Sequence, residues 1–295
     1  MPESEWLAEQ FEEHRAHLRA VAYRTLGSAS EAEDAVQESW IRLGRTDVSA
    51  VENLRAWLTT VVARVCLDML RTRTSRREDA LDLDVHVPDP LISRAEGDPE
   101  TGAMLADSVG LALLVVLETL EPAERLAFVL HDVFGMTFEE IGPIVNRSAV
   151  AARQLASRAR RRVQSRGPSP DRDLREQRRV VDAFMAAVRE GDFKRLIAVL
   201  DPNVVLRADG GALTSASRVV RGAHAVASQA ATFSRLGLAN QLVLVNGNLG
   251  FVSRRGDGRL FAVLGFTIAD GRIVEMDILA DPERLSRLDL SSIDG

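Results

Sequence analysis

The sequence predicts a multidomain protein with all-α domains in its first half and an α+β domain at its C-terminal end. Two observations support this prediction. Apolar residues recur at helical spacing through residues 5–71 and 108–163, and no strand pattern appears in residues 1–79. Beyond residue 171, helical patterns give way to short apolar segments separated by Asn-Gly and Asp-Gly pairs, which are typical of β-hairpins. A chain of 295 residues has room for two or three domains, each with its own core.

Composition indicates a globular protein that does not enter a membrane. Hydrophobic residues make up 46% of the chain and charged residues 27%. No apolar run reaches the roughly 18 to 20 residues that span a bilayer, and the N-terminus is acidic where a signal peptide would be basic. We therefore expect a cytoplasmic protein. The single cysteine, Cys66, excludes an internal disulfide, and five scattered histidines give no metal-binding pattern, so no cofactor is expected.

The first domain is predicted over residues 1–79, with helices over 5–26, from about 30 to 43, and over 54–71. Gly27 ends the first helix, and Ser30 is a candidate N-cap of the second because Glu33 follows at capping-box spacing. One face of the second helix, with Ala32, Val36, Ser39 and Trp40 among its members, is expected to be buried.

The other face of that second helix is mostly acidic. It carries Glu31, Asp34, Gln37, Glu38 and Arg42. A stripe of carboxylates repels DNA, so in a nucleic-acid-binding protein it must face something else, and a basic protein partner is the economical interpretation. Plain solubility charge is the alternative interpretation.

Residues 80–107 are predicted to form an acidic linker, because they hold seven acidic residues and one arginine and are rich in Pro and Gly. A helix-turn-helix domain is predicted over residues 108–166. Pro122 stands at a plausible first helical position, Thr137 and Glu140 have capping-box spacing, and Ser148 is a candidate cap of the last helix.

This last helix has the chemistry of a DNA-reading element. Ala151, Leu155, Ala159 and Val163 form a stripe that we expect to be buried, while most of the arginines and Gln154 point elsewhere. Arg binds phosphate or donates two hydrogen bonds to guanine, and Gln forms two hydrogen bonds with adenine in the major groove. A solvated basic face is the alternative.

Residues 1–166 resemble a known family through the order of three blocks of sequence. "AYRTLGSASEAEDAVQESWIRL" is followed by "NLRAWLTTVVARVCLDMLRTRTSRR", then by the acidic linker and the helix-turn-helix. This arrangement resembles bacterial sigma factors of the extracytoplasmic-function class. The resemblance implies two partners, core RNA polymerase (the beta-prime clamp and the beta flap) and promoter DNA.

The same resemblance implies roles for individual residues. Those expected to meet polymerase are Asp34, Gln37, Glu38 and Arg42. Those expected near the melted minus-ten element, where bases stack on aromatic and Arg side chains, are Asn53, Arg55, Trp57, Arg64 and Arg71; for Trp57 a place in the core is an equal alternative. Those expected at the minus-thirty-five element are Arg147, Ser148, Arg153, Gln154, Ser157, Arg158 and Arg161.

Residues 171–295 resemble SnoaL-like (nuclear-transport-factor-like) α+β cones, which a subgroup of these sigma factors carries as a built-in regulator. The subgroup's linker motif, Trp-Leu-Pro-Glu-Pro, is matched in part by "HVPDP" (86–90), and its Asp-Gly-Gly-Gly-Lys motif is matched in part, without the lysine, by "DGGAL" (209–213). The resemblance implies regulatory contacts between domains. The residues implied are Pro88, Asp89, Pro90, Asp209, Gly210 and Gly211.

Cones of this kind enclose a pocket, and members outside sigma factors are isomerases and cyclases that use a buried Asp or His. Polar candidates here are Asp209, His224 and Asp277, although spacing alone pairs no acid with a base. Apolar candidates for the pocket are Phe184, Phe233, Phe251, Phe261, Phe266 and Met276. A small-molecule ligand in the C-terminal domain is therefore conceivable from the sequence.

The function that these observations predict is promoter-specific transcription initiation with core polymerase, modulated by the cone and without catalysis by the chain itself. One alternative is a stand-alone, ligand-responsive helix-turn-helix regulator, which leaves the acidic face of the second helix unexplained. Another is an enzyme that acts through the cone, and fold alone does not establish that activity.

Overall fold

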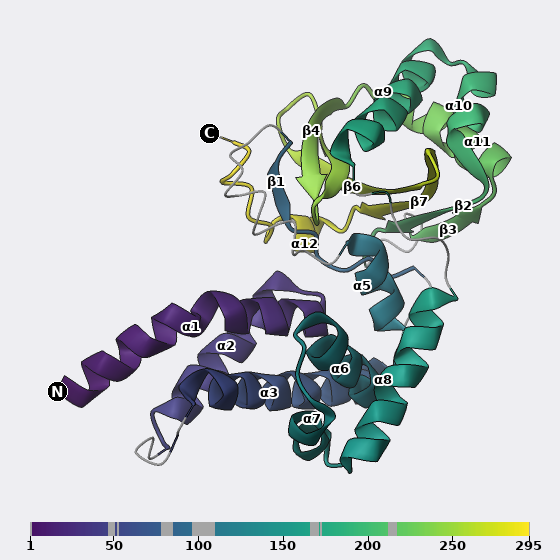
Figure 1. The fold of residues 1–295 in the computed structure, drawn as a ribbon. Helices are drawn as coiled ribbons and strands as arrows, with labels where there is room; N and C mark the ends of the chain where they lie inside the picture. Colours follow the sequence, from purple (N-terminus) through teal and green to yellow (C-terminus); the bar gives the residue numbers. More distant parts are fainter. Residues whose placement is uncertain are drawn as a thin grey trace. The chain divides into compact units, whose positions relative to one another are not determined.

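The structure is a computed structural model that describes residues 2–46, 51, 53–77, 85–95, 110–165, 171, 173–211 and 217–294. Most of the predicted linker, residues 80–84 and 96–107, lies outside these residues. The chain divides into two compact units, one made of residues 1–81 and 116–166 and the other of residues 82–115 and 167–295. Figure 1 draws the helices of the first unit and the helices and sheet of the second, so the predicted fold class is confirmed.

The first three helices are α1 (Pro2–Leu26), α2 (Ala29–Leu43) and α3 (Leu54–Arg77), and each packs against the other two. Their shared core is fully buried at Leu18, Val36 and Leu58. The predicted cap of α2 was wrong. Gly27 takes a left-handed backbone (φ 73°) and Ser28 an extended one, so Ser28 is the N-cap and accepts a hydrogen bond from the Glu31 N–H. Ser30 already lies inside the helix.

The next helix, α5 (Leu111–Glu118), has its first five residues in the second unit and its last three in the first. The remaining helices of the first unit are α6 (Pro122–Phe128), the π-helical turn η2 (Val129–Val133), α7 (Phe138–Val145) and α8 (Ala149–Gln164). Three local predictions are confirmed. Pro122 opens α6, Ser148 caps α8, and Thr137 and Glu140 close a reciprocal capping box at the start of α7.

The buried stripe of α8 differs from the predicted one. Ala152, Ala156 and Ala159 are fully buried, whereas Ala151, Leu155 and Val163 are half-buried at the edges of the stripe. The centre of the contact is therefore rotated by roughly 50° around the helix, toward a line of alanines that still includes Ala159. These small side chains let α8 lie close to α6 and α7, the two helices that it contacts most.

A buried ionic network joins helices of the first unit that are far apart in sequence. Arg125, which is 2% exposed, lies 2.9 Å from the Glu118 carboxylate. Arg73 on α3 also reaches Glu118 and donates to the Leu26 carbonyl oxygen at 3.2 Å. A second carboxylate, Glu31 at the start of α2, pairs with Arg73 as well. Separating any of these helices would leave a buried charge without its partner, which is strongly destabilising. The network therefore holds α2, α3, α6 and the end of α5 together.

The second unit is a seven-stranded sheet in the order β1-β4-β5-β6-β7-β2-β3, covered on one face by helices (Figure 1). The helices are α9 (Leu174–Glu190), α10 (Phe193–Val199) and α11 (Ala223–Phe233), with the 3₁₀ turn η3 (Ser234–Leu236) and a short α12 (Pro282–Leu285). The strands are β1 (Ile92–Arg94), β2 (Leu200–Asp209), β3 (Arg218–Arg221), β4 (Ala239–Val245), β5 (Asn248–Arg254), β6 (Leu260–Ala269) and β7 (Arg272–Leu279).

The predicted meander from β4 to β7 is confirmed, but the sheet is not wholly antiparallel, because β2 pairs with β7 in parallel. Two strands, β1 and β3, were not predicted from the sequence. β3 has four residues, and β1 has three residues that come from the expected linker and pair with β4 through Ile92↔Val245. Segments this short carry no periodicity from which a strand can be read.

Side chains of β2 and β7 alternate between the two faces of the sheet. Leu206 and Met276 join the core beneath the helices, whereas Leu279 joins a smaller outer core with Val87, Leu111 and residues near the C-terminus. Among the described residues, no helix is both long and apolar enough to cross a bilayer.

We predict that Gly142→Ala destabilises the helix-turn-helix. A Cβ at this position would lie 2.8 Å from the Arg147 carbonyl oxygen and 3.2 Å from the Ala149 nitrogen, so the turn itself must move. The expected loss is about 1 to 3 kcal/mol, more than the roughly 1 kcal/mol that alanine gains in a helix. Urea unfolding followed by circular dichroism measures it. Gly44→Ala is the control, since its Cβ would make only 3.8 Å contacts and its φ is −63°; equal midpoints for the two variants would contradict the prediction.

Candidate nucleic-acid interface and linker clamp

The acidic face of α2 is only partly available to a partner. Arg73 and Arg15 pair with two of its carboxylates, Glu31 and Glu33, and these pairs are internal to the unit. Glu38 pairs with Arg42 at 2.8 Å on the helix surface, and both side chains stay more than 40% exposed. Asp34 and Gln37 are exposed. The residues predicted to meet polymerase thus share an accessible face.

An exposed apolar patch adjoins this face. Trp40 was expected on the buried side of α2, but it is 38% exposed, and its neighbour Ile41 is 46% exposed. The Trp40 ring packs against the Phe11 ring of α1 at a centroid distance of 5.0 Å, and Trp6 on α1 is 50% exposed. Large apolar side chains exposed beside charges are typical of protein-binding surfaces. The sequence pattern did not predict these exposed side chains, because apolar periodicity shows which residues share a helix face but not whether another element covers that face.

The residues predicted to lie near the melted strand are on α3. Trp57, Arg64 and Arg71 are seven residues apart, so they lie along one side of the helix. Arg64 and Arg71 are exposed and Trp57 is half-buried. Asn53 caps the helix by accepting from the Ala56 N–H at 3.0 Å, and Arg55 lies 3.4 Å from the His17 ring.

The arginines of α8 fall into two groups. Arg158 and Arg162 donate to the two carboxylate oxygens of Glu124 at 2.7 and 3.1 Å, and that carboxylate is only 6% exposed. In the same way, Arg160 binds Asp132 through two hydrogen bonds. These three arginines hold α8 against α6 and η2. Arg158 therefore combines a predicted place at DNA with a structural contact.

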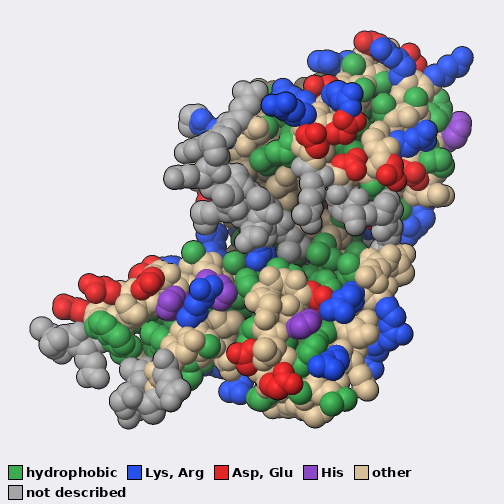
Figure 2. Space-filling model, in the orientation of Figure 1, with side chains coloured by type: hydrophobic (Ala, Val, Ile, Leu, Met, Phe, Trp, Pro, Cys, Tyr) green, Lys and Arg blue, Asp and Glu red, His purple; other side chains and the backbone are tan. Residues whose placement is uncertain are grey.

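The other group remains directed at solvent. Arg153, Gln154 and Arg161 on α8 and Arg147 in the turn before it are exposed, and Figure 2 shows basic side chains gathered over α8. The Arg153 guanidinium lies over the Phe138 ring at 5.3 Å from its centroid. This contact orients the guanidinium but leaves its N–H groups available for hydrogen bonds. Ser148 is occupied as the N-cap, accepting from the Ala151 N–H at 3.2 Å, and Ser157 is half-buried. A capped helix that presents guanidinium and amide groups to solvent is suited to a major groove.

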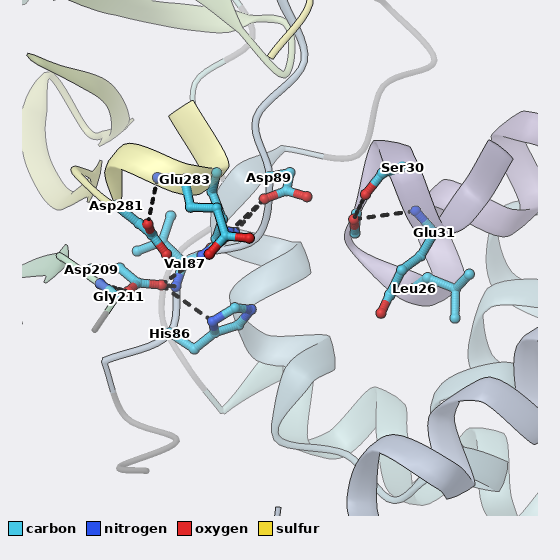
Figure 3. Close-up of polar contacts among 12 residues, drawn as sticks. Leu26, Ser30, Glu31, His86, Val87, Asp89, Asp209, Gly211, Asp281 and Glu283 are labelled. Atoms are coloured by element: carbon cyan, nitrogen blue, oxygen red, sulfur yellow. Dashed lines mark hydrogen bonds and ion pairs between the residues drawn. The ribbon is translucent and has the colours of Figure 1, made fainter. Parts of the chain in front are cut away.

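In the second unit, the Asp209 carboxylate binds the linker (Figure 3). It accepts hydrogen bonds from the Val87 N–H at 3.0 Å and the Gly211 N–H at 3.0 Å, and His86 lies 3.2 Å away. Asp209 ends β2, and Gly211 takes a left-handed backbone (φ 60°) that turns its N–H back toward the carboxylate. We call this group of contacts, with those of Arg284, the linker clamp.

Arg284 on α12 completes the linker clamp. It donates to Asp209 at 2.8 Å, to the Val87 carbonyl oxygen at 2.6 Å and to the Asp89 carboxylate at 2.7 Å. Pro88 and Pro90 are buried on either side of Asp89. Gly210 lies in the same turn and donates to the Ser217 hydroxyl. The roles of Arg284 and His86 in these contacts were not predicted, since nothing in the local sequence pattern links Arg284 to Val87 and Asp89, almost 200 positions away.

The charge of Asp209 is maintained by its partners. Burial alone raises the pKa of this carboxyl, but hydrogen bonds from His86, Val87 and Gly211 and the charge of Arg284 outweigh it and hold the pKa at about 2. The clamp is thus a set of charge-assisted hydrogen bonds, which are stronger than neutral ones. Farther along the linker, the Asn246 side chain accepts from the Leu91 N–H and its own N–H donates to the Leu91 carbonyl oxygen.

The inner face of the sheet and the helices enclose a cavity of about 500 Å³. Of the apolar candidates, Phe184, Phe233, Phe251, Phe261 and Met276 line it, and Phe266 lies in the core behind them. The three polar candidates do not line it. Asp209 belongs to the clamp, Asp277 is buried against Arg207 at 2.8 Å, and His224 is exposed on α11. The residues singled out as acid or base are therefore not directed at one cavity.

Two family models match the helical parts of the chain. The model of Sigma-70 region 2 matches residues 10–76, and the model of Sigma-70 region 4 matches residues 110–163. These ranges contain α2 and α3 with their candidate polymerase and minus-ten residues, and the helix-turn-helix with α8.

Full-length relatives extend the similarity into the cone. The ECF RNA polymerase sigma factor SigJ of Mycobacterium tuberculosis is 38% identical over 294 residues, which covers 94% of this chain and 92% of the relative. The probable ECF RNA polymerase sigma factor SigI of the same species is 36% identical, covering 93% of each chain. The crystal structure of SigJ matches with a TM-score of 0.74 and 34% identity, covering 96% of this chain and 99% of that one.

Both sigma regions are present, and the similarity to SigJ and SigI spans nearly the whole length of each chain. The chain belongs to the extracytoplasmic-function family of RNA polymerase sigma factors, which direct transcription initiation.

Proposed function

We propose that this sigma factor assigns separate tasks to its parts. Residues 1–79 act as region 2, with α2 on the beta-prime clamp of core polymerase and α3 at the minus-ten element. Residues 108–166 act as region 4, with α8 at the minus-thirty-five element beside the beta flap. Residues 80–107 join them, and the cone of residues 171–295 modulates activity by holding part of this linker. Core polymerase is the partner, so we place the chain in the cytoplasm.

Docking of α2 on polymerase is supported by an exposed face that combines charge with apolar area. Asp34, Gln37 and the Glu38–Arg42 pair are accessible, next to Trp40 and Ile41. Interfaces of this kind obtain affinity from the apolar centre and orientation from charged neighbours. Net charge supports the same assignment, because a chain of net charge −6 that relies on polymerase for affinity needs its basic helix only to choose a site.

We predict that Glu38→Ala weakens binding to core polymerase about 3- to 10-fold, the effect of losing one interfacial charge contact. Glu12→Ala is the matched control, since Glu12 is an exposed carboxylate that pairs with an arginine on its own helix at 3.0 Å. Fluorescence anisotropy of the labelled chain titrated with core polymerase gives both dissociation constants. Equal constants for the two variants would remove α2 from the interface.

We predict that Arg153→Ala relaxes base preference at one position of the minus-thirty-five element, at a cost of about 1 to 3 kcal/mol. Reconstituted holoenzyme is tested in run-off transcription on a promoter pool with a randomised upstream element. Arg158→Ala is the comparison, because it removes one of the two arginines on the buried Glu124 carboxylate and should lower the thermal midpoint. An Arg153 variant with unchanged preference at every position would rule out base reading by that residue.

Modulation by the cone is supported by one observation, the linker clamp. The segment that joins the two DNA-reading regions is bound at both of its described ends, at Val87 by Asp209 and Arg284 and at Ile92–Arg94 by pairing with β4. These contacts reduce the conformational freedom of the linker, and they narrow the range of distances that it allows between regions 2 and 4. Events at the outer face of the sheet can therefore alter promoter engagement.

We predict that Asp209→Asn loosens the linker and changes transcription. Hydrogen exchange in a peptide covering residues 86–91 should be about tenfold faster, because a charge-assisted network is lost. Run-off yield from holoenzyme should differ at least about threefold from wild type. Asp182→Asn is the control, since Asp182 is exposed on α9 and pairs only with Arg178 at 3.6 Å among the described contacts. Faster exchange with unchanged transcription would contradict modulation through the clamp.

The Asp209 contribution should also depend on pH. The folded-state pKa of about 2 is below the ordinary value of 3.8, so the stabilisation is present above about pH 4 and is lost as the pH falls through 2. At neutral pH it amounts to about 2 kcal/mol. Urea unfolding of wild type and Asp209→Asn should give free energies that converge on acidification from pH 7 to pH 3, and curves that stay parallel would contradict this origin of the stability.

A further inference from the structure

The cavity of the cone has an apolar floor. Its volume of about 500 Å³ lies within the range of small-molecule sites, roughly 300 to 1,000 Å³. Phe184, Leu206, Phe251, Met276 and Ile278 line it and are buried. Among the described lining residues, Ser253 is the one buried polar side chain, and it donates to the Asn240 side-chain oxygen at 2.7 Å. The described part of the interior therefore presents apolar surface and no unsatisfied side-chain donor.

The rim of the same cavity is polar and positively charged. Arg189, Ser234 and Asn240 line it and are exposed. Among the described lining residues Arg189 is the only charged one, and it forms no hydrogen bond or ion pair with another described residue. The adjacent carboxylate, Glu190, is engaged by Arg195 at 2.6 Å.

Two further guanidinium groups lie against the walls. Arg218 lies over the Phe233 ring at 5.9 Å and Arg255 over the Phe261 ring at 4.8 Å, and both rings line the cavity. Positive charge around a low-dielectric hollow attracts anions. A carboxylate at the rim would meet an unengaged arginine, whereas a cationic head group would be repelled.

The described lining residues are suited to binding a ligand, and they include no Asp, Glu or His that could act as a general acid or base. Asp209 and Asp277 do not line the cavity, and neither does His224. The arginine guanidinium at its rim stays protonated, so it serves neither as general base nor as general acid.

We propose that this cavity binds one amphipathic anion, with an unbranched apolar body on the phenylalanine floor and an anionic head group of the fatty-acid carboxylate type on Arg189. The proposal goes beyond the modulation of transcription described above and does not depend on it, because the free full-length chain suffices for binding.

The test is isothermal titration calorimetry of the full-length chain with dodecanoate and with dodecyltrimethylammonium, both below their critical micelle concentrations. We expect one dodecanoate per chain, bound at least about tenfold more tightly than the cation of the same tail. Absence of dodecanoate binding, or equal affinity for the two probes, would overturn the proposal.

Variants locate the site. Arg189→Gln should weaken dodecanoate binding about 5- to 10-fold and leave the affinity for the cationic probe unchanged or higher. Arg179→Gln is the matched control, since Arg179 lies on the same helix, is 72% exposed and is not part of the lining. Ala230→Phe fills the cavity and should reduce binding at least about tenfold, with thermal unfolding confirming the fold. Arg189→Gln with wild-type affinity, or a folded Ala230→Phe that still binds, would overturn the proposal.

A transcription assay separates this proposal from the proposed function. If dodecanoate binds as expected but run-off yield does not respond to Asp209→Asn, the cavity site stands and modulation through the clamp fails. If the clamp variant alters transcription but dodecanoate does not bind, the cavity site fails and the modulation stands.

Discussion

One buried carboxylate, that of Asp209, binds together three stretches of chain that sequence places far apart. It joins the linker at Val87, the turn at Gly211 and the C-terminal helix through Arg284. A buried charge is costly unless it is paired and hydrogen-bonded, so this arrangement is stable only while all its partners are in place. The linker of this sigma factor is therefore part of the fold of the cone at its described residues and not a free tether.

Strand β2 ends at the clamp residue Asp209 and also lines the cavity together with its neighbour β7. On β2, Leu206 points to the inner face while Asp209 ends the strand at the clamp, and on β7, Met276 and Ile278 point inward. Consecutive residues of a strand face opposite sides. A single layer of sheet thus separates a hydrophobic cavity from the contacts that hold the linker, so the two sites share backbone although they share no side chain.

The arginines in and before α8 fall into a paired and an exposed group, which is compatible with the DNA-reading role that we propose for this helix in an acidic protein. Arg158, Arg160 and Arg162 are paired with Glu124 and Asp132, so their charge stabilises the helix-turn-helix. Arg153 and Arg161 on the helix and Arg147 before it stay exposed. If polymerase supplies most of the affinity, as we propose, a few exposed guanidinium groups suffice for choosing a sequence, and a large positive field is unnecessary.

The sequence by itself determined the features that depend on neighbours within about one turn of chain: helix positions, the start of α6 at Pro122, the caps at Thr137 and Ser148, the strands of the meander, and the family through the order of its motifs. Tertiary structure alone decided that β1 joins the sheet, that β2 runs parallel to β7, that Trp40 is exposed, that alanines 152, 156 and 159 form the buried stripe, and that Asp277 faces away from the cavity. Local propensity and periodicity act over a few residues. Burial and ion pairing depend on contacts between segments that are far apart in the chain, such as those of Asp209 and Arg284, 75 residues apart, and no local pattern encodes them.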